Sequence, residues 1–303
     1  MKILFISSGS IGDAIISTGI LNHLMEEYPE ASFTVAVGPA AIPLFEACPR
    51  IEKVISMFKL PMNRHWLELW KKTHETFWDV IIDLRGSIIG WILNAHHRVV
   101  FRKPDKSLPK AQQLAAMLDL KSPPPPKLWI SDETRIAARA MLPKDKKVVI
   151  FAPRTNSTAK DWPLDNFIEL ERKLYKDGIV FAILCSQLQH QSLQPMFRTL
   201  PADHLLDLGG KTDLPTAYAV IEQAALFIGS DSGLLHMAAA AGTPSVGIYG
   251  PSNDKTYAPR SDKLRIVTAR EFKAGEPEQH DQPYIKMVSV EKVEEAVRSL
   301  GVL

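Results

Sequence analysis

The sequence has few of the features that mark secreted, membrane-spanning or nucleic-acid-binding proteins. Its only cysteines, Cys48 and Cys185, show no sign of a disulfide framework and suit a reducing cytosol. The formal net charge is +2, which is too small to imply a nucleic-acid partner. The apolar start of the chain is broken at residues 7–13, SSGSIGD, before a signal peptide or a spanning helix could form. We therefore expect a cytoplasmic protein without a transmembrane helix.

Metal-ligand and cofactor patterns are missing as well. The sequence contains no Asp-x-Asp pair, and its histidines between positions 65 and 97 have no acidic or cysteine partner at ligand spacing. The N-terminal glycines read G-x-x-G-D instead of G-x-G-x-x-G, so NAD or FAD binding is not supported. In G-S-D-S-G, Asp231 stands where a nucleophile elbow requires serine. We therefore expect neither a metal nor a bound cofactor.

The most informative stretch is LFIGSDSGLLHMAAAAGTPSVGIYGP, residues 226–251. Its pattern predicts a strand, a polar turn, a helix of small residues and a second strand, at 226–228, 229–233, 234–241 and 245–249. Gly229 and Gly233 allow a sharp turn, and the serines and aspartate between them can cap the helix while its first amide groups stay free. Such a helix N-terminus is a ready phosphate site, which indicates a nucleotide diphosphate. Taken singly, the same residues are equally compatible with plain caps and close packing.

Strands alternate with helices along the rest of the chain, which predicts parallel sheets. Before the proline-rich linker at 121–146, strands are predicted at 2–6, 33–37, 54–57 and 80–84, and helices at 14–28, 40–47, 64–76, 88–95 and 110–120. After it, further strands are predicted at 148–152, 179–184 and 264–267, and helices at 164–176, 187–200, 214–223 and 290–300. The sequence therefore predicts an α/β protein of two Rossmann-like domains, 1–130 and 131–303, facing a cleft.

Several motifs resemble one family. The order D-S-G-L-L-H-M-A-A-A-A-G-T-P at 231–244, followed by Y-G-P-S, is similar to the donor-binding signature of glycosyltransferase family 9, the ADP-heptose heptosyltransferases of lipopolysaccharide core assembly. The N-terminal strand followed by G-D, I-I-D-L-R-G at 81–86, and K-D-W-P at 160–163 match it too. The resemblance covers nearly the whole chain. It implies the GT-B architecture, with an acceptor-binding first domain and a nucleotide-sugar-binding second domain, and leaves open that the final helix packs back on the first.

Asp13 is the strongest candidate for a catalytic group. It follows Gly12 at the end of the first predicted strand, where open α/β sheets place their ligands. On the residues alone, the favoured role of Asp13 is only to complement the positive end of the next helix. The resemblance implies that Asp13 is the general base, which takes the proton from the acceptor hydroxyl, and that Gly12 lies beside the donor.

The resemblance also implies how the ADP-heptose donor is held. Lys160, ahead of the W-P pair, would pair with the diphosphate, and Thr155 and Asn156 would add hydrogen bonds to phosphate. Without the family, Lys160 could equally be a solvated loop lysine. The remaining donor contacts are expected from the turn and the helix that follows it, from Asp231, Ser232, Gly233, Leu234 and His236.

Basic residues of the first half are candidates for the acceptor. They are Arg64, Arg98, Arg102 and Lys103, and they could bind the carboxylates and phosphates of an acidic lipid-linked saccharide. Charge runs of this kind are usually solvated faces, which remains the alternative. Trp66, Leu67 and Trp70 are compatible with a core and with a membrane surface.

Together, the motifs and the resemblance imply an inverting, metal-independent transferase. It would move a heptose from ADP-heptose to a Kdo/heptose-lipid A type acceptor, in the cytoplasm or peripherally on the cytoplasmic face of the inner membrane. Two alternatives stay open: a sugar-nucleotide epimerase of GT-B shape, and a noncatalytic ADP-sugar-binding protein.

Overall fold

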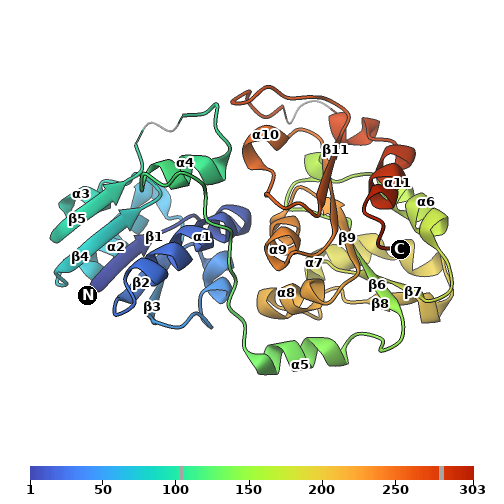
Figure 1. Ribbon diagram of the computed structural model, residues 1–303, viewed down its shortest axis with the longest axis horizontal. Coiled ribbons are helices and arrows are strands. Elements are labelled where there is room, and N and C mark those ends of the chain that lie inside the picture. The colour runs from blue at the N-terminus through green and yellow to red at the C-terminus, as the bar shows by residue number, and fades with distance from the viewer. Residues whose placement is uncertain (103–104, 280–282) are drawn as a thin grey trace. The chain divides into compact units, whose positions relative to one another are not determined.

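The computed structural model describes residues 1–102, 105–279 and 283–303. Its chain divides into two compact units, Met1–Trp129 and Ile130–Leu303 (Figure 1). Each unit is built on one sheet, and the strand pairs of both sheets are parallel. The predicted α/β fold with two parallel sheets is confirmed.

The first unit contains a five-stranded sheet of order β3-β2-β1-β4-β5. Its strands are β1 (Lys2–Ile6), β2 (Ser32–Val37), β3 (Ile51–Ser56), β4 (Trp78–Asp83) and β5 (Ala95–Val100). Its helices are α1 (Ile11–Glu27), α2 (His65–Thr73), α3 (Ile89–Ile92) and α4 (Lys110–Ala116), with short 3-10 turns η1 (Pro39–Leu44) and η2 (Pro61–Asn63). The strand order reverses between β1 and β4, and open sheets of this kind bind ligands at the carboxyl ends of the two strands that flank such a reversal.

Helices α2 and α3 pack on one shared apolar core of the first unit. Leu69 of α2 and Ile89 of α3 lie in one buried cluster with Trp78 of β4, and Trp66 and Trp70 pack against this cluster in partly buried positions. The two tryptophans therefore contribute to the core, one of the two roles that the sequence left open for them.

The second unit contains a six-stranded sheet of order β11-β10-β9-β6-β7-β8. Its strands are β6 (Lys147–Ala152), β7 (Ile179–Ile183), β8 (Leu205–Asp207), β9 (Leu226–Ser230), β10 (Ser245–Tyr249) and β11 (Leu264–Thr268). Its α-helices are α5 (Asp132–Ala140), α6 (Leu164–Leu174), α7 (Gln187–His190), α8 (Leu214–Glu222), α9 (Gly233–Ala241), α10 (Asp254–Tyr257) and α11 (Val290–Ser299). Its 3-10 turns are η3 (Thr158–Lys160), η4 (Gln191–Leu193), η5 (Met196–Arg198), η6 (Ala202–His204) and η7 (Tyr284–Met287). Here the strand order reverses between β6 and β9.

The last helix, α11, packs on α6 and β11 of its own unit and buries its three valines there. The sequence left open that this helix returns to the first unit, and the structure places it in the core of the second. The apolar spacing of Val290, Val293 and Val297 puts all three on one helix face, which explains the packing.

Some predicted elements differ from the structure, each for a local reason. The presumed linker contains α5, a helix whose N-cap Ser131 accepts a hydrogen bond from the Thr134 amide. The basic stretch near position 98 is an edge strand, β5, whose polar sequence lacks the apolar run of a central strand. The predicted helix at 40–47 is the 3-10 turn η1, because Pro43 cannot donate a helical hydrogen bond.

Helix α6 buries a carboxylic acid, Glu171. One of its oxygens accepts a hydrogen bond from the Thr199 hydroxyl, and the other has no hydrogen-bond partner within the described part of the chain. Burial raises the pKa of Glu171 from 4.5 to about 7, although Thr199 and Arg172 act in the opposite direction. Below pH 7 the folded protein therefore holds this group protonated and neutral.

We expect this group to make the protein less stable as the pH rises from about 4.5 to about 7. In that window the folded state keeps a proton that the unfolded chain has lost, so the free energy of unfolding falls with pH. The loss is about 3 kcal/mol at full extent. Urea unfolding across this range should show a smaller pH dependence for Glu171→Gln than for wild type. Glu169→Gln, an exposed neighbour on the same helix, is the matched control. Equal pH dependence in wild type and Glu171→Gln would contradict the raised pKa of Glu171.

Candidate functional site

The strand reversal in the second unit brings two predicted donor residues together. Lys160 ends η3 in the loop after β6, and Asp231 follows β9, the neighbouring strand. The Nζ of Lys160 lies 2.7 Å from Oδ2 of Asp231, although the residues are 71 positions apart in the sequence. Their side chains are only 22% and 10% exposed. The result is a largely buried ion pair at the position where open sheets bind ligands.

Both members of this pair are charged at neutral pH. Burial acts to raise the pKa of Asp231, but Lys160, with further contributions from Ser252 and His236, outweighs it and holds the pKa below its ordinary value. Burial likewise acts to lower the pKa of Lys160, and the attraction of Asp231 outweighs it, so that pKa is raised. An anion that enters this site would compete with Asp231 for the ammonium group of Lys160.

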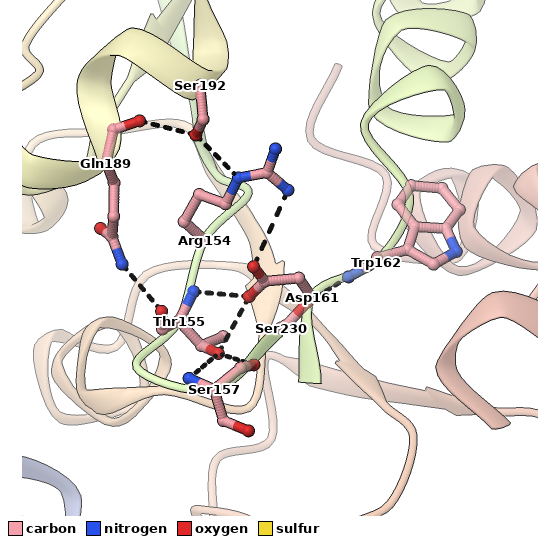
Figure 2. A network of polar contacts seen from close by, with 8 residues as sticks. All are labelled: Arg154, Thr155, Ser157, Asp161, Trp162, Gln189, Ser192 and Ser230. Carbon is pink, nitrogen blue, oxygen red and sulfur yellow. Dashed lines mark hydrogen bonds and ion pairs between the residues drawn. The ribbon is translucent and has the colours of Figure 1, made fainter. Parts of the chain in front are cut away.

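The loop that carries Lys160 is organised by Asp161 (Figure 2). Its Oδ1 accepts hydrogen bonds from the amide of Thr155 at 2.7 Å and from the Thr155 hydroxyl at 2.9 Å. Its Oδ2 lies 3.8 Å from Nη1 of Arg154. The hydroxyl of Thr155 also accepts a hydrogen bond from the Ser157 amide. Thr155 therefore shapes the loop. Asn156, the other residue expected to contact phosphate, is exposed.

Contacts with other elements hold the same loop on two sides, and Figure 2 shows those with Gln189 and Ser192. Gln189 of α7 donates to the carbonyl of Thr155 at 2.8 Å, and Nε of Arg154 donates to the Ser192 hydroxyl at 3.1 Å. On the other side, the buried Trp162 donates its ring N–H to the carbonyl of Val288 at 2.8 Å. Lys160 thus sits on a loop that is braced by these contacts. Sequence reasoning missed these bracing side chains, and the only signal for them was that Asp161 and Trp162 belong to the K-D-W-P motif.

The N-terminus of α9 has the form expected of a phosphate site. Ser232 is the N-cap, but its hydroxyl makes no capping hydrogen bond and is buried without a hydrogen-bond partner in the described residues. Gly233 and Leu234 open the helix, and the first turn has no acidic residue. The amide groups of the first turn and the positive end of the helix dipole would both attract an anion. His236 is buried in the same turn.

Tyr249 at the end of β10 is a site residue that the sequence analysis did not single out. It is fully buried, and burial together with the nearby Asp231 charge raises its pKa well above the ordinary value. Its hydroxyl therefore stays protonated and can donate a hydrogen bond near the Lys160–Asp231 pair. In the sequence, the signal for Tyr249 was the Y-G-P-S motif that follows α9 and begins with this residue.

In the first unit, Asp13 lies in the first turn of α1, after the carboxyl end of β1. Its Oδ2 accepts hydrogen bonds from the Ser10 hydroxyl at 2.8 Å and from the Ser8 hydroxyl at 3.3 Å. Gly12 and Asp13 are both partly exposed. The carboxylate is thus oriented by two hydroxyl groups and still accessible, an arrangement that suits a base as well as the helix-terminus role.

Asp83, which ends β4, is a turn cap. It accepts hydrogen bonds from the Arg85 amide at 2.9 Å and from the amide and hydroxyl of Ser87 at 2.7 and 2.6 Å. Burial raises its pKa, and these hydrogen bonds oppose the shift. Asp83 therefore stabilises the turn that follows β4.

Two glycines set the position of the loop that leads to Asp13. A Cβ atom at Gly38, after β2, would lie 2.5 Å from the Cα of Gly9 and 3.0 Å from its carbonyl oxygen. A Cβ atom at Gly9 would meet only the Cα of Gly38, at 4.0 Å. The loop between β1 and α1 therefore requires glycine at position 38 but tolerates a side chain at position 9.

We expect Gly38→Ala to displace this loop and lower turnover by about 10- to 100-fold, since misplacement of reacting groups by about 1 Å has effects of this size. Gly9→Ala should remain near wild type. Both variants can be compared by turnover at saturating substrate and by thermal unfolding. A Gly38→Ala protein with unchanged turnover, or a Gly9→Ala protein impaired to the same degree, would show that the loop position does not matter.

Three of the four predicted acceptor residues are exposed in the first unit. Arg64 is the N-cap of α2, Arg98 lies on β5, and the guanidinium of Arg102 lies 4.1 Å from the ring centre of Trp91. Lys103 lies outside the described residues. Within the described chain, no hydrogen bond or ion pair connects the three arginines to Asp13.

None of the helices in the described ranges is both long enough and apolar enough to cross a bilayer. No three His, Cys, Asp or Glu side chains in the same ranges lie together in a way that could hold a metal ion.

The chain is similar in sequence to one family of known proteins. The model of glycosyltransferase family 9 (heptosyltransferase) matches residues 91–286, well over half of the chain. Lipopolysaccharide heptosyltransferase 2 of Salmonella typhimurium is 24% identical over 308 residues, which cover 88% of this chain and 88% of that protein.

Solved structures are similar over nearly the whole chain. A family 9 glycosyltransferase from Veillonella parvula matches with a TM-score of 0.82 at 20% identity, covering 99% of this chain and 96% of that one. The Escherichia coli heptosyltransferase WaaC with ADP matches with a TM-score of 0.73 at 17% identity, covering 99% and 100%. At these identities the likeness shows the fold, which is that of the GT-B heptosyltransferases.

Proposed function

Because the chain belongs to glycosyltransferase family 9, whose members are heptosyltransferases, we propose that it transfers a heptose from ADP-heptose to an acidic saccharide of the lipopolysaccharide core. The acceptor would be of the Kdo/heptose-lipid A type. The observation that carries the proposal is the buried Lys160–Asp231 ion pair at the strand reversal of the second unit, next in the chain to the N-terminus of α9. A diphosphate fits this combination of a buried cation and a helix N-terminus.

The donor would be held by the second unit. Lys160 would bind the diphosphate, and the amide groups of Gly233 and Leu234 would bind the oxygens on its other side. The buried hydroxyls of Ser232 and Tyr249 are available as further hydrogen-bond groups. The relative that was solved with ADP supports an adenosine diphosphate in the equivalent role.

The reaction that these residues suit is a direct displacement with inversion. The acceptor hydroxyl oxygen forms a bond to the anomeric carbon, while the bond from that carbon to the diphosphate oxygen breaks. ADP leaves with the bonding electrons, and the hydroxyl proton passes to the carboxylate of Asp13. Lys160 would stabilise the negative charge that grows on the departing diphosphate.

A lipid-linked acceptor has consequences for the first unit and for location. The exposed guanidinium groups of Arg64, Arg98 and Arg102 can each bind a carboxylate or phosphate in a bidentate manner. Because such an acceptor is anchored in a bilayer, the protein would act peripherally on the cytoplasmic face of the inner membrane.

The proposal is tested by ADP release from ADP-heptose, with and without a Kdo-lipid A type acceptor. Acceptor-dependent release, with a glycosylated product of matching mass, supports the transferase. An epimerase would instead convert the nucleotide sugar without any acceptor, which NMR of the donor would detect. Donor binding without ADP release in the presence of a panel of Kdo- and heptose-containing acceptors would exclude the transfer and favour a binding protein.

A further inference from the structure

Exposed apolar side chains are concentrated in one region of the first unit. Phe58 is 61% exposed, Met62 is 87% exposed and Ile88 is 66% exposed. Leu67, Trp91 and Ile92 are exposed as well. Single exposed apolar residues are ordinary, but a gathering of large ones rimmed by polar groups marks an interaction surface.

Helix α3 is apolar on both of its sides. Ile89 and Leu93 are buried in the core, and the opposite side shows Ile88, Trp91 and Ile92 at the spacing of one helix face. A helix that is hydrophobic all round is normally covered on both sides. The outer side of α3 is thus suited to an apolar surrounding that the described residues do not supply.

The segment before α2 presents its apolar residues in a similar way. Met62 and Asn63 have left-handed backbone angles, with φ of 50° and 56°, which are costly for residues other than glycine. The Met62 side chain lies in solvent. On α2, Leu67 faces outward because Leu69, two positions later, faces the core.

These two segments are neighbours. The guanidinium of Arg85, just before α3, lies 6.0 Å from the ring centre of Trp66, at the start of α2. Leu69 and Ile89 also share one buried cluster, so the two helices turn their outer sides away from the same core. We call the six exposed side chains the apolar face: Phe58, Met62, Leu67, Ile88, Trp91 and Ile92.

The surroundings of the apolar face are basic. Lys59, Arg64, Arg85 and Arg102 are exposed in or beside these segments. In the described residues none of the four forms an ion pair with a carboxylate. The nearby acidic groups are engaged elsewhere, since Glu68 pairs with Lys71 at 3.0 Å and Asp83 is buried in its turn. Apolar side chains bordered by uncompensated cations are complementary to a bilayer that carries anionic headgroups.

We propose that the apolar face docks the first unit on an anionic lipid bilayer, with the side chains of α3 and of the loop before α2 inserted at the headgroup boundary. The proposal deepens the proposed function, because a lipid-linked acceptor would be met at that surface. Vesicle binding is measured without donor or acceptor, so that the docking and the transfer can fail separately.

The test is cosedimentation of the full chain with vesicles. Wild type should bind vesicles of phosphatidylglycerol and phosphatidylethanolamine, bind phosphatidylcholine vesicles weakly, and lose binding as salt is raised. The double variant Ile88→Ser/Ile92→Ser should partition about 30-fold less onto the anionic vesicles, because two apolar side chains no longer leave water. Its turnover on a delipidated, water-soluble acceptor should be unchanged.

Ile136→Ser/Leu188→Ser is the matched control, because both residues are exposed apolar side chains of the second unit. It should bind vesicles like wild type. Quenching of tryptophan fluorescence by brominated lipids provides a readout that does not depend on the folding of the double variant. The fluorescence of wild type should be quenched, and Trp91→Phe should lose most of this quenching.

Four outcomes would overturn the proposal. They are absence of wild-type binding to anionic vesicles, equal binding of the Ile88→Ser/Ile92→Ser variant, and quenching that persists in Trp91→Phe. The fourth is a wild-type dimer that this variant dissociates without any vesicle binding, which would identify the apolar face as a contact between two copies of the chain.

Discussion

The Asp13→Asn variant is expected to transfer heptose about 10²- to 10⁴-fold more slowly than wild type and to bind the donor normally. Asparagine has the shape of aspartate, and its carbonyl oxygen can still accept hydrogen bonds from the hydroxyls of Ser10 and Ser8. It cannot take a proton from the acceptor. The measurements are steady-state ADP release with acceptor and donor affinity by calorimetry, both on the full chain.

The competing role for Asp13 is to complement the positive end of α1, and it predicts a different pattern. Removal of that charge would cost about 0.3–1 kcal/mol of stability and leave the rate nearly unchanged. Ser10→Ala separates the two roles, because it removes the N-cap hydroxyl but keeps the carboxylate. We expect it to lower stability by about 1 kcal/mol and to lower the rate far less than Asp13→Asn does. If the two variants lose turnover equally, Asp13 is not the base.

The second large effect is expected from Lys160→Met. The variant should lose about 10²- to 10³-fold in turnover, because the charge on the leaving diphosphate is no longer stabilised. It should also be destabilised by about 3–5 kcal/mol, since Asp231 would remain in a largely buried position without its partner. The measurements are turnover and urea unfolding at neutral pH.

The double variant Lys160→Met/Asp231→Asn distinguishes binding from stability. With both charges removed, much of the lost stability should return, whereas donor affinity should stay low. The stability of the wild-type protein should also depend on pH in a definite direction. In wild type the pKa of Asp231 is lowered, so its stabilising contribution is present above about pH 4 and is lost as the pH falls through the folded-state pKa. Recovery of donor affinity in the double variant would show that Lys160 has only a structural role.

Much of the fold could be predicted from local pattern. β1 and β10 were predicted with their observed bounds, because buried strands of parallel sheets are continuous apolar runs. The helix of residues 233–241 was predicted to within one residue, since Gly242 ends it in a left-handed conformation. Elements whose sequence lacks such a pattern were missed. The sequence of β5 is largely polar, and the predicted helix at 187–200 is divided into short pieces around Pro195.

The candidate site was predictable in part, and the resemblance to the family carried most of it. It implied Lys160 and Asp231 as donor residues, but no local pattern showed that the two form one ion pair. Thr155 was expected to contact phosphate, which stays a prediction, and its hydroxyl also shapes the loop through Asp161. A sequence motif names residue types that recur together; it does not tell which of them bind ligand and which hold the others in place.

What the sequence determined by itself was the alternation of strands and helices and the glycine turn before α9. These follow from interactions between residues a few positions apart. The pairing of Lys160 with Asp231, the bracing of their loop by α7, and the exposed apolar side of α3 were decided only by the tertiary structure. The reason is that β6 and β9 become neighbours through the packing of the whole sheet, and burial depends on that packing. No window of sequence contains that information.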